Sequence, residues 1–233
     1  MATTVSGFTT TTTWTVPANI TSVTAECWGG GGASGAAQGS PCTTGGAAGG
    51  SYARSVLTVV PGNVLTVTVG AGGLAVSNAS GNTGGVSWFS GATVIYAQGG
   101  AGSATVTANS ANGAPGVGST GSTIGTVKYR GGSGATGDFT ATTGYSGGGG
   151  GGPGSTEAGR DAIQISGGTA SSDIGGSGGL GVRDNIGGNV GNIYGGGASG
   201  GKANGNTNRQ GANGAAGYVR LTWSTARRII HVY

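Results

Sequence analysis

Recurring sets of glycines three residues apart are the feature of this sequence that most limits how the chain can fold. Of the 233 residues 59 are glycine, and after Gly99 many of them recur with a spacing of three. This period fits neither a helix nor a strand, but it fits the left-handed threefold rod of the polyproline-II type, which rises ~3.1 Å per residue. Such a rod has no internal hydrogen bonds, so buried rods must bond to one another.

The composition favours packed rods over collagen or a flexible linker. Collagen needs a strict Gly-X-Y register and abundant proline, whereas the chain has 5 prolines. Disordered chains combine low hydrophobicity with high net charge, whereas 35% of these residues are hydrophobic and only 7% are charged. Glycines on the touching faces would let the backbones approach closely. The glycines predicted to pack between rods are Gly131, Gly134, Gly137, Gly144, Gly147, Gly150, Gly175, Gly178 and Gly181.

The first hundred residues have the alternation of β-strands. "FTTTTTWTV", from Phe8 to Val16, predicts one strand, and "SVTAECW", from Ser22 to Trp28, predicts the next with Cys27 buried. Residues 51–60 and 63–70 flank Pro61-Gly62-Asn63, which predicts a hairpin.

Two further patterns complete the predicted β structure. Residues 86–98 predict a short hairpin around Ser90-Gly91, and "GYVRLTW" at 217–223 predicts a strand that returns to the N-terminal strands. In that last strand Val219, Leu221 and Trp223 share one face.

The predicted fold is therefore all-β. It has a small antiparallel β-sandwich-like base, a glycine-rich lattice of polyglycine-II rods, and essentially no α-helix. We assign residues 1–98 with 217–223 to the base, 99–216 to the lattice, and 224–233 to a short basic and apolar tail.

The sequence offers little for catalysis, cofactors or nucleic acid. The net charge of +4 comes from scattered residues without a basic stripe, and no stretch is long and apolar enough for a membrane helix. The lone His231 stands near the end of the chain, and no carboxylate pair or phosphate loop has a recognisable motif. We expect no enzyme activity, no metal and no cofactor. Cys27 and Cys42 are expected to be reduced thiols, although a bridge between them stays open.

Binding fits this chain better than catalysis, because loops on a rigid scaffold often carry function. The candidate receptor contacts are the aromatic residues of the glycine region, Tyr129, Phe139, Tyr145 and Tyr194; each could instead cap the lattice. The candidate docking residues for a larger assembly are those of the tail, Arg227, Arg228, Ile229, Ile230 and Tyr233; the tail could equally be a frayed end.

Four stretches resemble one known family. "TWTVPANITSVTAECWGGGG", "VLTVTVGAGG", "GGVSWFSGATVIYAQGGAG" and "GAAGYVRLTW", in this order, resemble the glycine-rich domain of many tailed-bacteriophage proteins. The family includes tail-fibre and virion proteins and is similar to the fibre-tip adhesins of T-even-like phages, whose polyglycine-II rods carry receptor-binding loops.

The resemblance implies a virion structural protein of the tail or fibre, made in the host cytoplasm, which attaches to the host surface through its loops. Its partners would be other virion proteins and a host cell-surface protein or polysaccharide. A homo-oligomer is compatible with this role, although the sequence shows no oligomer seam. The alternative is a capsid decoration protein or head fibre without a receptor role. An ice-binding or matrix-binding protein is a third class, which the irregular glycine spacing disfavours.

Overall fold

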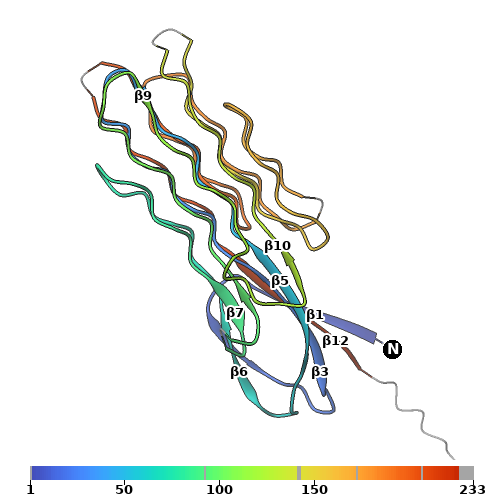
Figure 1. Cartoon of the computed structure of the whole chain (residues 1–233). Coiled ribbons are helices and arrows are strands. Elements are labelled where there is room, and N and C mark those ends of the chain that lie inside the picture. Colours follow the sequence, from blue (N-terminus) through green and yellow to red (C-terminus); the bar gives the residue numbers. More distant parts are fainter. Residues whose placement is uncertain (1, 92, 141–142, 172, 206, 226–233) are drawn as a thin grey trace, which may run out of the picture.

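The computed structural model describes residues 2–91, 93–140, 143–171, 173–205 and 207–225. Within these ranges the chain forms strands, turns and extended rods but no helix, which confirms the all-β prediction. The molecule is elongated, with the longer strands at one end and a bundle of rods leading away from them (Figure 1).

Two antiparallel sheets form the base. The five-stranded sheet has the order β1 (Ala2–Phe8), β12 (Tyr218–Thr225), β3 (Ser22–Trp28), β5 (Tyr52–Thr58) and β10 (Val127–Tyr129). The four-stranded sheet has the order β2 (Thr12–Thr15), β6 (Val64–Thr68), β7 (Ser87–Phe89) and β8 (Tyr96–Ala97). Their facing side chains make the main hydrophobic core, so the base is a β-sandwich.

Large aromatic rings and small aliphatic side chains fill this core. The Trp14 ring of the four-stranded sheet lies 5.8 Å from Phe89 and 5.3 Å from Trp223 of the opposite sheet, measured between ring centroids. Leu221 and Cys27 are fully buried beside them. The alternation seen in the sequence therefore placed the inward faces of β3 and β12 correctly.

The predicted single strand from Phe8 to Val16 is wrong, because the chain leaves one sheet and enters the other within it. β1 ends at Phe8 in the five-stranded sheet, and β2 begins at Thr12 in the four-stranded sheet. Between the strands the Thr11 hydroxyl accepts a hydrogen bond from the Val69 N–H at 3.1 Å. The run of threonines has no pattern that marks the crossing.

The predicted hairpin around Pro61-Gly62-Asn63 is also wrong. β5 pairs with β3 and β10, whereas β6 pairs with β2 and β7, so the turn connects the two sheets. Gly62 has φ +84°, as turn chemistry demands. The two strands place their apolar side chains face to face across the core, and a side-by-side hairpin would not close the sandwich.

The other two predicted pairings are confirmed. β7 and β8 pair antiparallel across a turn in which Ser90 and Gly91 both have positive φ. β12 returns from the glycine region and inserts between β1 and β3, with Ala2 opposite Thr225 and Trp28 opposite Tyr218.

A central rod at residues 44–50 shows how the lattice is held together. Three of its N–H groups, spaced three residues apart, donate to the same neighbouring segment over distances of 2.8 to 3.0 Å. The donors are Thr44, Ala47 and Gly50, and their acceptors lie in residues 195–201. This period of three is that of a polyglycine-II rod.

The other N–H groups of the central rod turn to different neighbours. Gly46 and Gly49 donate to residues 132–135, and Ala48 donates to the carbonyl of Ala101 at 2.9 Å. Segments that bond to residues 43–50 surround the rod, namely 29–37, 98–106, 113–116, 131–135, 147–151 and 195–201. Backbone hydrogen bonds between rods therefore take the place of a wide hydrophobic core.

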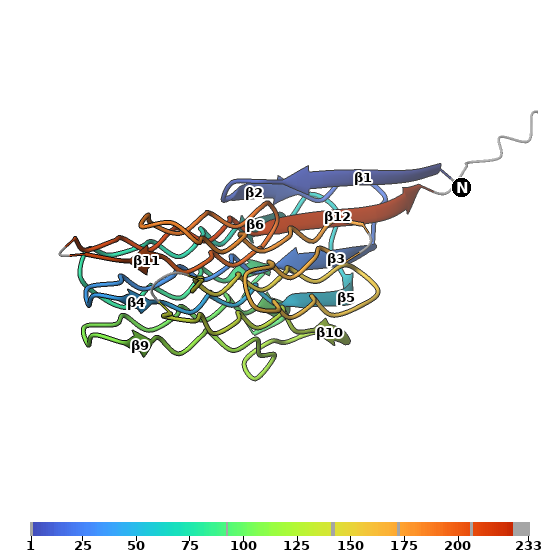
Figure 2. The same cartoon turned by 90° about the horizontal axis from the view of Figure 1, so that it is seen from above.

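The lattice begins earlier in the chain than our assignment of residues 99–216. Residues 29–50, between β3 and β5, and residues 70–85, between β6 and β7, also run as bonded rods. These two connections between base strands thus run out into the lattice. At the end far from the base a small sheet joins β11 (Lys202–Ala203), β4 (Cys42–Thr43) and β9 (Ala111–Asn112) (Figure 2).

Candidate functional site

A row of aromatic rings crosses the five-stranded sheet where the base meets the lattice. Tyr129, Tyr52, Trp28 and Tyr218 are successive cross-strand partners on β10, β5, β3 and β12. Tyr52 stacks on Tyr129 with centroids 5.8 Å apart, and Tyr218 stacks on Tyr194 at 4.3 Å. Trp28 and Tyr52 in the middle are fully buried, so this aromatic row packs the junction from within.

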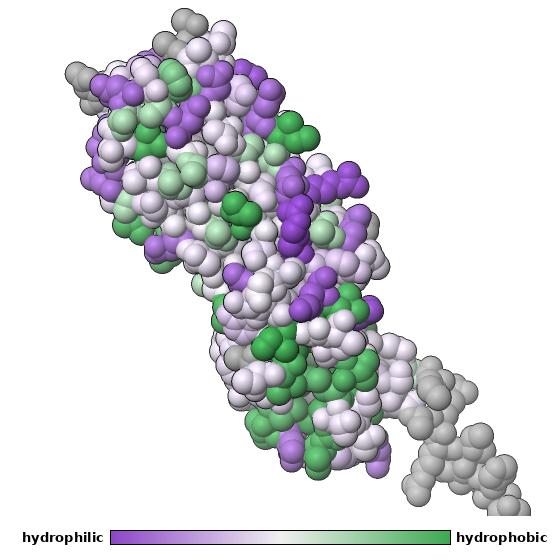
Figure 3. All heavy atoms as spheres, in the orientation of Figure 1, coloured by the Kyte–Doolittle hydropathy of each residue, from purple (hydrophilic) through white to green (hydrophobic). Residues whose placement is uncertain are grey.

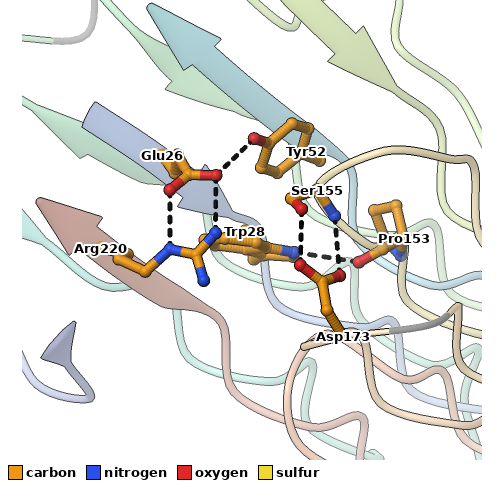
Figure 4. Close-up of polar contacts among 7 residues, drawn as sticks. All are labelled: Glu26, Trp28, Tyr52, Pro153, Ser155, Asp173 and Arg220. Carbon is orange, nitrogen blue, oxygen red and sulfur yellow. Dashed lines mark hydrogen bonds and ion pairs between the residues drawn. The ribbon is translucent and has the colours of Figure 1, made fainter. Parts of the chain in front are cut away.

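A charged network lies next to the aromatic row. Arg220 holds the Glu26 carboxylate with two hydrogen bonds, from Nε to Oε2 at 2.6 Å and from Nη2 to Oε1 at 2.8 Å. The Tyr52 hydroxyl donates to Oε1 at 2.7 Å (Figure 4). Glu26 is only 5% exposed, and the Arg220 guanidinium also lies 5.3 Å from the Trp28 ring. Burial and the Glu26 carboxylate raise the pKa of Tyr52, which stays protonated.

The same junction anchors two loops of the glycine region. The Trp28 indole N–H donates to the Pro153 carbonyl at 2.9 Å, and this bond is buried. Ser155, two residues on, donates from its N–H and its hydroxyl to Asp173, at 3.0 Å and 2.5 Å (Figure 4). The Trp28 indole bond joins the base to the lattice, and the Glu26–Arg220 pair beside it joins β3 to β12 within the base. The arrangement has the chemistry of a structural joint.

The structure divides the four predicted receptor aromatics between two places. Tyr129 and Tyr194 belong to the aromatic row, where each is half-buried against another tyrosine. Phe139 and Tyr145 lie at the far end of the lattice, where Asp138 pairs with Tyr145 across a loop. The far pair is thus the better placed to meet a partner.

The far-end loop has its own polar supports. Arg183 lies over the Tyr145 ring at 5.6 Å, and the buried Lys202 ammonium on β11 donates to the Gly144 carbonyl at 2.7 Å.

A hollow on the surface of the lattice has a volume of about 520 Å³. Its lining is rich in amide and hydroxyl side chains: Ala36, Ser77, Asn78, Gly187, Asn208, Arg209 and Gln210. Sequence inspection missed these residues, because asparagine and serine are also the ordinary residues of turns.

All nine predicted rod-packing glycines lie where a side chain would collide. A Cβ at any of them would come closer than 3.0 Å to another atom. At Gly137 that atom is the Thr43 hydroxyl oxygen, and at Gly144 it belongs to the same loop. At the other seven it is the carbonyl oxygen of a neighbouring segment: Gly131, Gly134, Gly147, Gly150, Gly175, Gly178 and Gly181.

The predicted docking tail and the two cysteines lie apart from these sites. Arg227, Arg228, Ile229, Ile230 and Tyr233 lie outside the described residues. Both cysteines are free and fully buried, and burial raises the pKa of each thiol. Cys42 also donates to the Gly39 carbonyl at 3.0 Å.

Apolar side chains are concentrated on the base (Figure 3). Val56, Val60 and Val64 are each more than half exposed. A shallow hollow of about 300 Å³ at the turn between β5 and β6 has the lining Leu57, Thr58, Val59, Val60, Asn63, Leu65, Ser90 and Val94. Such an apolar end suits contact with another protein.

The described residues contain neither a candidate metal cluster nor a helix that could cross a membrane. No group of three or more histidine, cysteine or acidic side chains there could hold a metal ion. No helix of the described part is long and apolar enough to span a membrane.

The sequence model of one protein family, described as a glycine-rich domain, matches residues 4–224. This range takes in the base, the aromatic row and the whole described lattice. None of the curated proteins matches the sequence.

Proposed function

The chain belongs to the glycine-rich domain family, and we propose that it is a non-enzymatic bacteriophage virion protein of the tail or fibre. In this role the rod lattice presents loops to the host surface, and the β-sandwich anchors the protein to the virion. The resemblance of four stretches to tailed-phage proteins supports the virion role. The elongated shape and the distribution of loops support the attachment role.

One observation carries the proposal. The first and last described strands lie side by side in the base, with Ala2 opposite Thr225, whereas β4, β9 and β11 lie at the opposite end (Figure 2). A protein held by its base would therefore point the far-end loops outward. These loops carry Phe139 and Tyr145, and function concentrates on loops held by a rigid scaffold.

Location on the particle is the first test. Immunogold labelling with an antibody to this chain should place gold at the tail or fibre ends of purified particles that carry it. Gold over the head would replace the proposal by capsid decoration. Particles without gold would contradict both virion roles.

The attachment role has a separate test. Purified protein should compete with the particles for adsorption to their host cells, and Phe139→Ala should weaken this competition at least about ten-fold, since buried aromatic anchors dominate interfaces. Val64→Ala is the matched control, because it truncates a residue that is 63% exposed on the base. Equal competition by the two variants would rule out Phe139 as a receptor contact.

A further inference from the structure

β1 leaves one long edge of the five-stranded sheet open. The strand pairs with β12 along one side over all seven residues from Ala2 to Phe8. No other described strand pairs with its second side, and β1 forms the border of the sheet (Figure 2). Backbone N–H and C=O groups on an unpaired edge are free to bind another strand.

This edge lacks the devices that usually protect a sheet border. "ATTVSGF" contains no charged residue and no proline, and five of its seven residues are exposed. The opposite border differs: β10 has only three residues, carries Lys128 and is followed by Arg130. Short strands and lysines are common protections of an edge, so β10 is blocked where β1 is open.

We infer that β1 pairs antiparallel with β1 of a second copy of this chain, which gives a two-fold dimer with one continuous sheet. In such a self-pair, a residue close to the two-fold axis faces the same residue, or a near neighbour of it, in the second copy. A charge at any position near the axis would therefore face the same charge, which is destabilising. A strand of seven uncharged residues with threonine and valine at its centre avoids this repulsion, and so it fits a copy of itself.

The side chains around Val5 extend the same argument to the sheet surface. Val5 is 57% exposed and begins a cross-strand row that continues through Thr222 and Thr24 to Val56. All four lie on the outer face of the sheet. In the dimer this β-branched row runs on across the axis, and like β-branched neighbours pack well on a pleated surface. This inference stands on the strand edge alone and is independent of the proposed function.

The test compares two exposed valines of one cross-strand row that differ in their distance from β1. Val5→Lys places an ammonium at the open β1 edge, whereas Val56→Lys places it on the same face of β5, three strands away from β1. Sedimentation velocity of the full chain at about 1 to 200 µM should show a concentration-dependent dimer, since small interfaces give affinities on the order of micromolar. Val5→Lys should weaken the dimer at least ten-fold, and Val56→Lys should leave it unchanged.

Hydrogen exchange supplies a second readout that does not depend on a variant. Amides of residues 2–8 in the unmodified protein should become more protected as concentration rises, while those of 127–129 should not change. A monomer throughout the range, equal loss of dimer in both variants, or β1 amides indifferent to concentration would overturn the inference. A monomer would indicate that a different protein, and not a second copy of this chain, pairs with the β1 edge.

Discussion

At the scale of single residues, Gly147 shows why glycine is required inside the lattice. Its Cβ position falls against the carbonyl oxygen of Ala135, and the N–H of Gly46 lies within 3.0 Å as well. Both groups are backbone atoms of other rods, which cannot rotate away as a side chain can. Glycine is therefore required at this position because a side chain has no room, and not because the backbone adopts a left-handed conformation.

Gly147→Ala should lose about 3 kcal/mol of unfolding free energy or fail to fold, because overpacking here must displace a rod. Gly121→Ala is the matched control, since its Cβ would meet only the Ser119 hydroxyl at 3.3 Å. Urea denaturation followed by circular dichroism measures both. Similar midpoints for the two variants would contradict close rod packing.

Glu26 gives a second prediction at this scale, because its charge is buried and paired. Arg220→Met should cost about 3–5 kcal/mol of unfolding free energy, since it leaves an uncompensated buried carboxylate. Arg130→Met is the control: it breaks the ion pair with Asp161, whose side chains are 41% and 49% exposed, and should cost about 0–1 kcal/mol. A small effect of Arg220→Met would mean that water reaches Glu26.

At the scale of elements, a rod behaves unlike a strand or a helix. The N–H groups of the central rod donate to three different segments, 195–201, 132–135 and Ala101, so one rod of seven residues joins several others. A strand, in contrast, hydrogen-bonds only to the two strands that flank it in a sheet. Rods therefore pack in a bundle, and the number of bonds per residue stays high even though few side chains are apolar.

Amides of Thr44, Ala47 and Gly50 should exchange with solvent only through global unfolding, although they lie in no helix or longer strand. Native-state hydrogen exchange monitored by NMR measures this, and the exposed turn at residues 9–10 provides the fast-exchanging comparison. Exchange of the three amides at the rate of that turn would show that the rods open locally.

Sequence patterns predicted the elements better than their connections. The alternation in β3 and β12 fixed their buried faces, and glycine spacing found the rods. The path between sheets at residues 9–11 and 61–63 could not be predicted, because the same turn residues serve a hairpin or a sheet crossing. At the junction, Trp28 was predicted only as the last residue of a strand and as part of a resemblance, because nothing local to it shows that Pro153 will accept its N–H.

At the scale of the whole molecule, we expect base and lattice to fold as one unit. The rods at 29–50 and 70–85 come from between base strands, and Trp28 bonds to Pro153 across the junction. Residues 99–216 expressed alone lack the central rod to which 132–135 and 195–201 bond.

This fragment of residues 99–216 should therefore not fold. Its NMR spectrum should show poorly dispersed amides, and the full chain prepared in parallel should show dispersed ones. A dispersed, cooperatively melting fragment would mean that the later rods need no partner from the first hundred residues.

The bonds of the central rod also determine when the lattice can close during synthesis. Residues 44–50 leave the ribosome early, but the segment that accepts the bonds of Thr44, Ala47 and Gly50 extends to Gly201. Translation of the 151 residues from Ser51 to Gly201 takes roughly 8 to 30 s at ~5–20 residues per second. Earlier segments can bond to the rod before then, but the Thr44 N–H waits for its acceptor until Gly201 is made, so the lattice closes only when almost the whole chain has emerged.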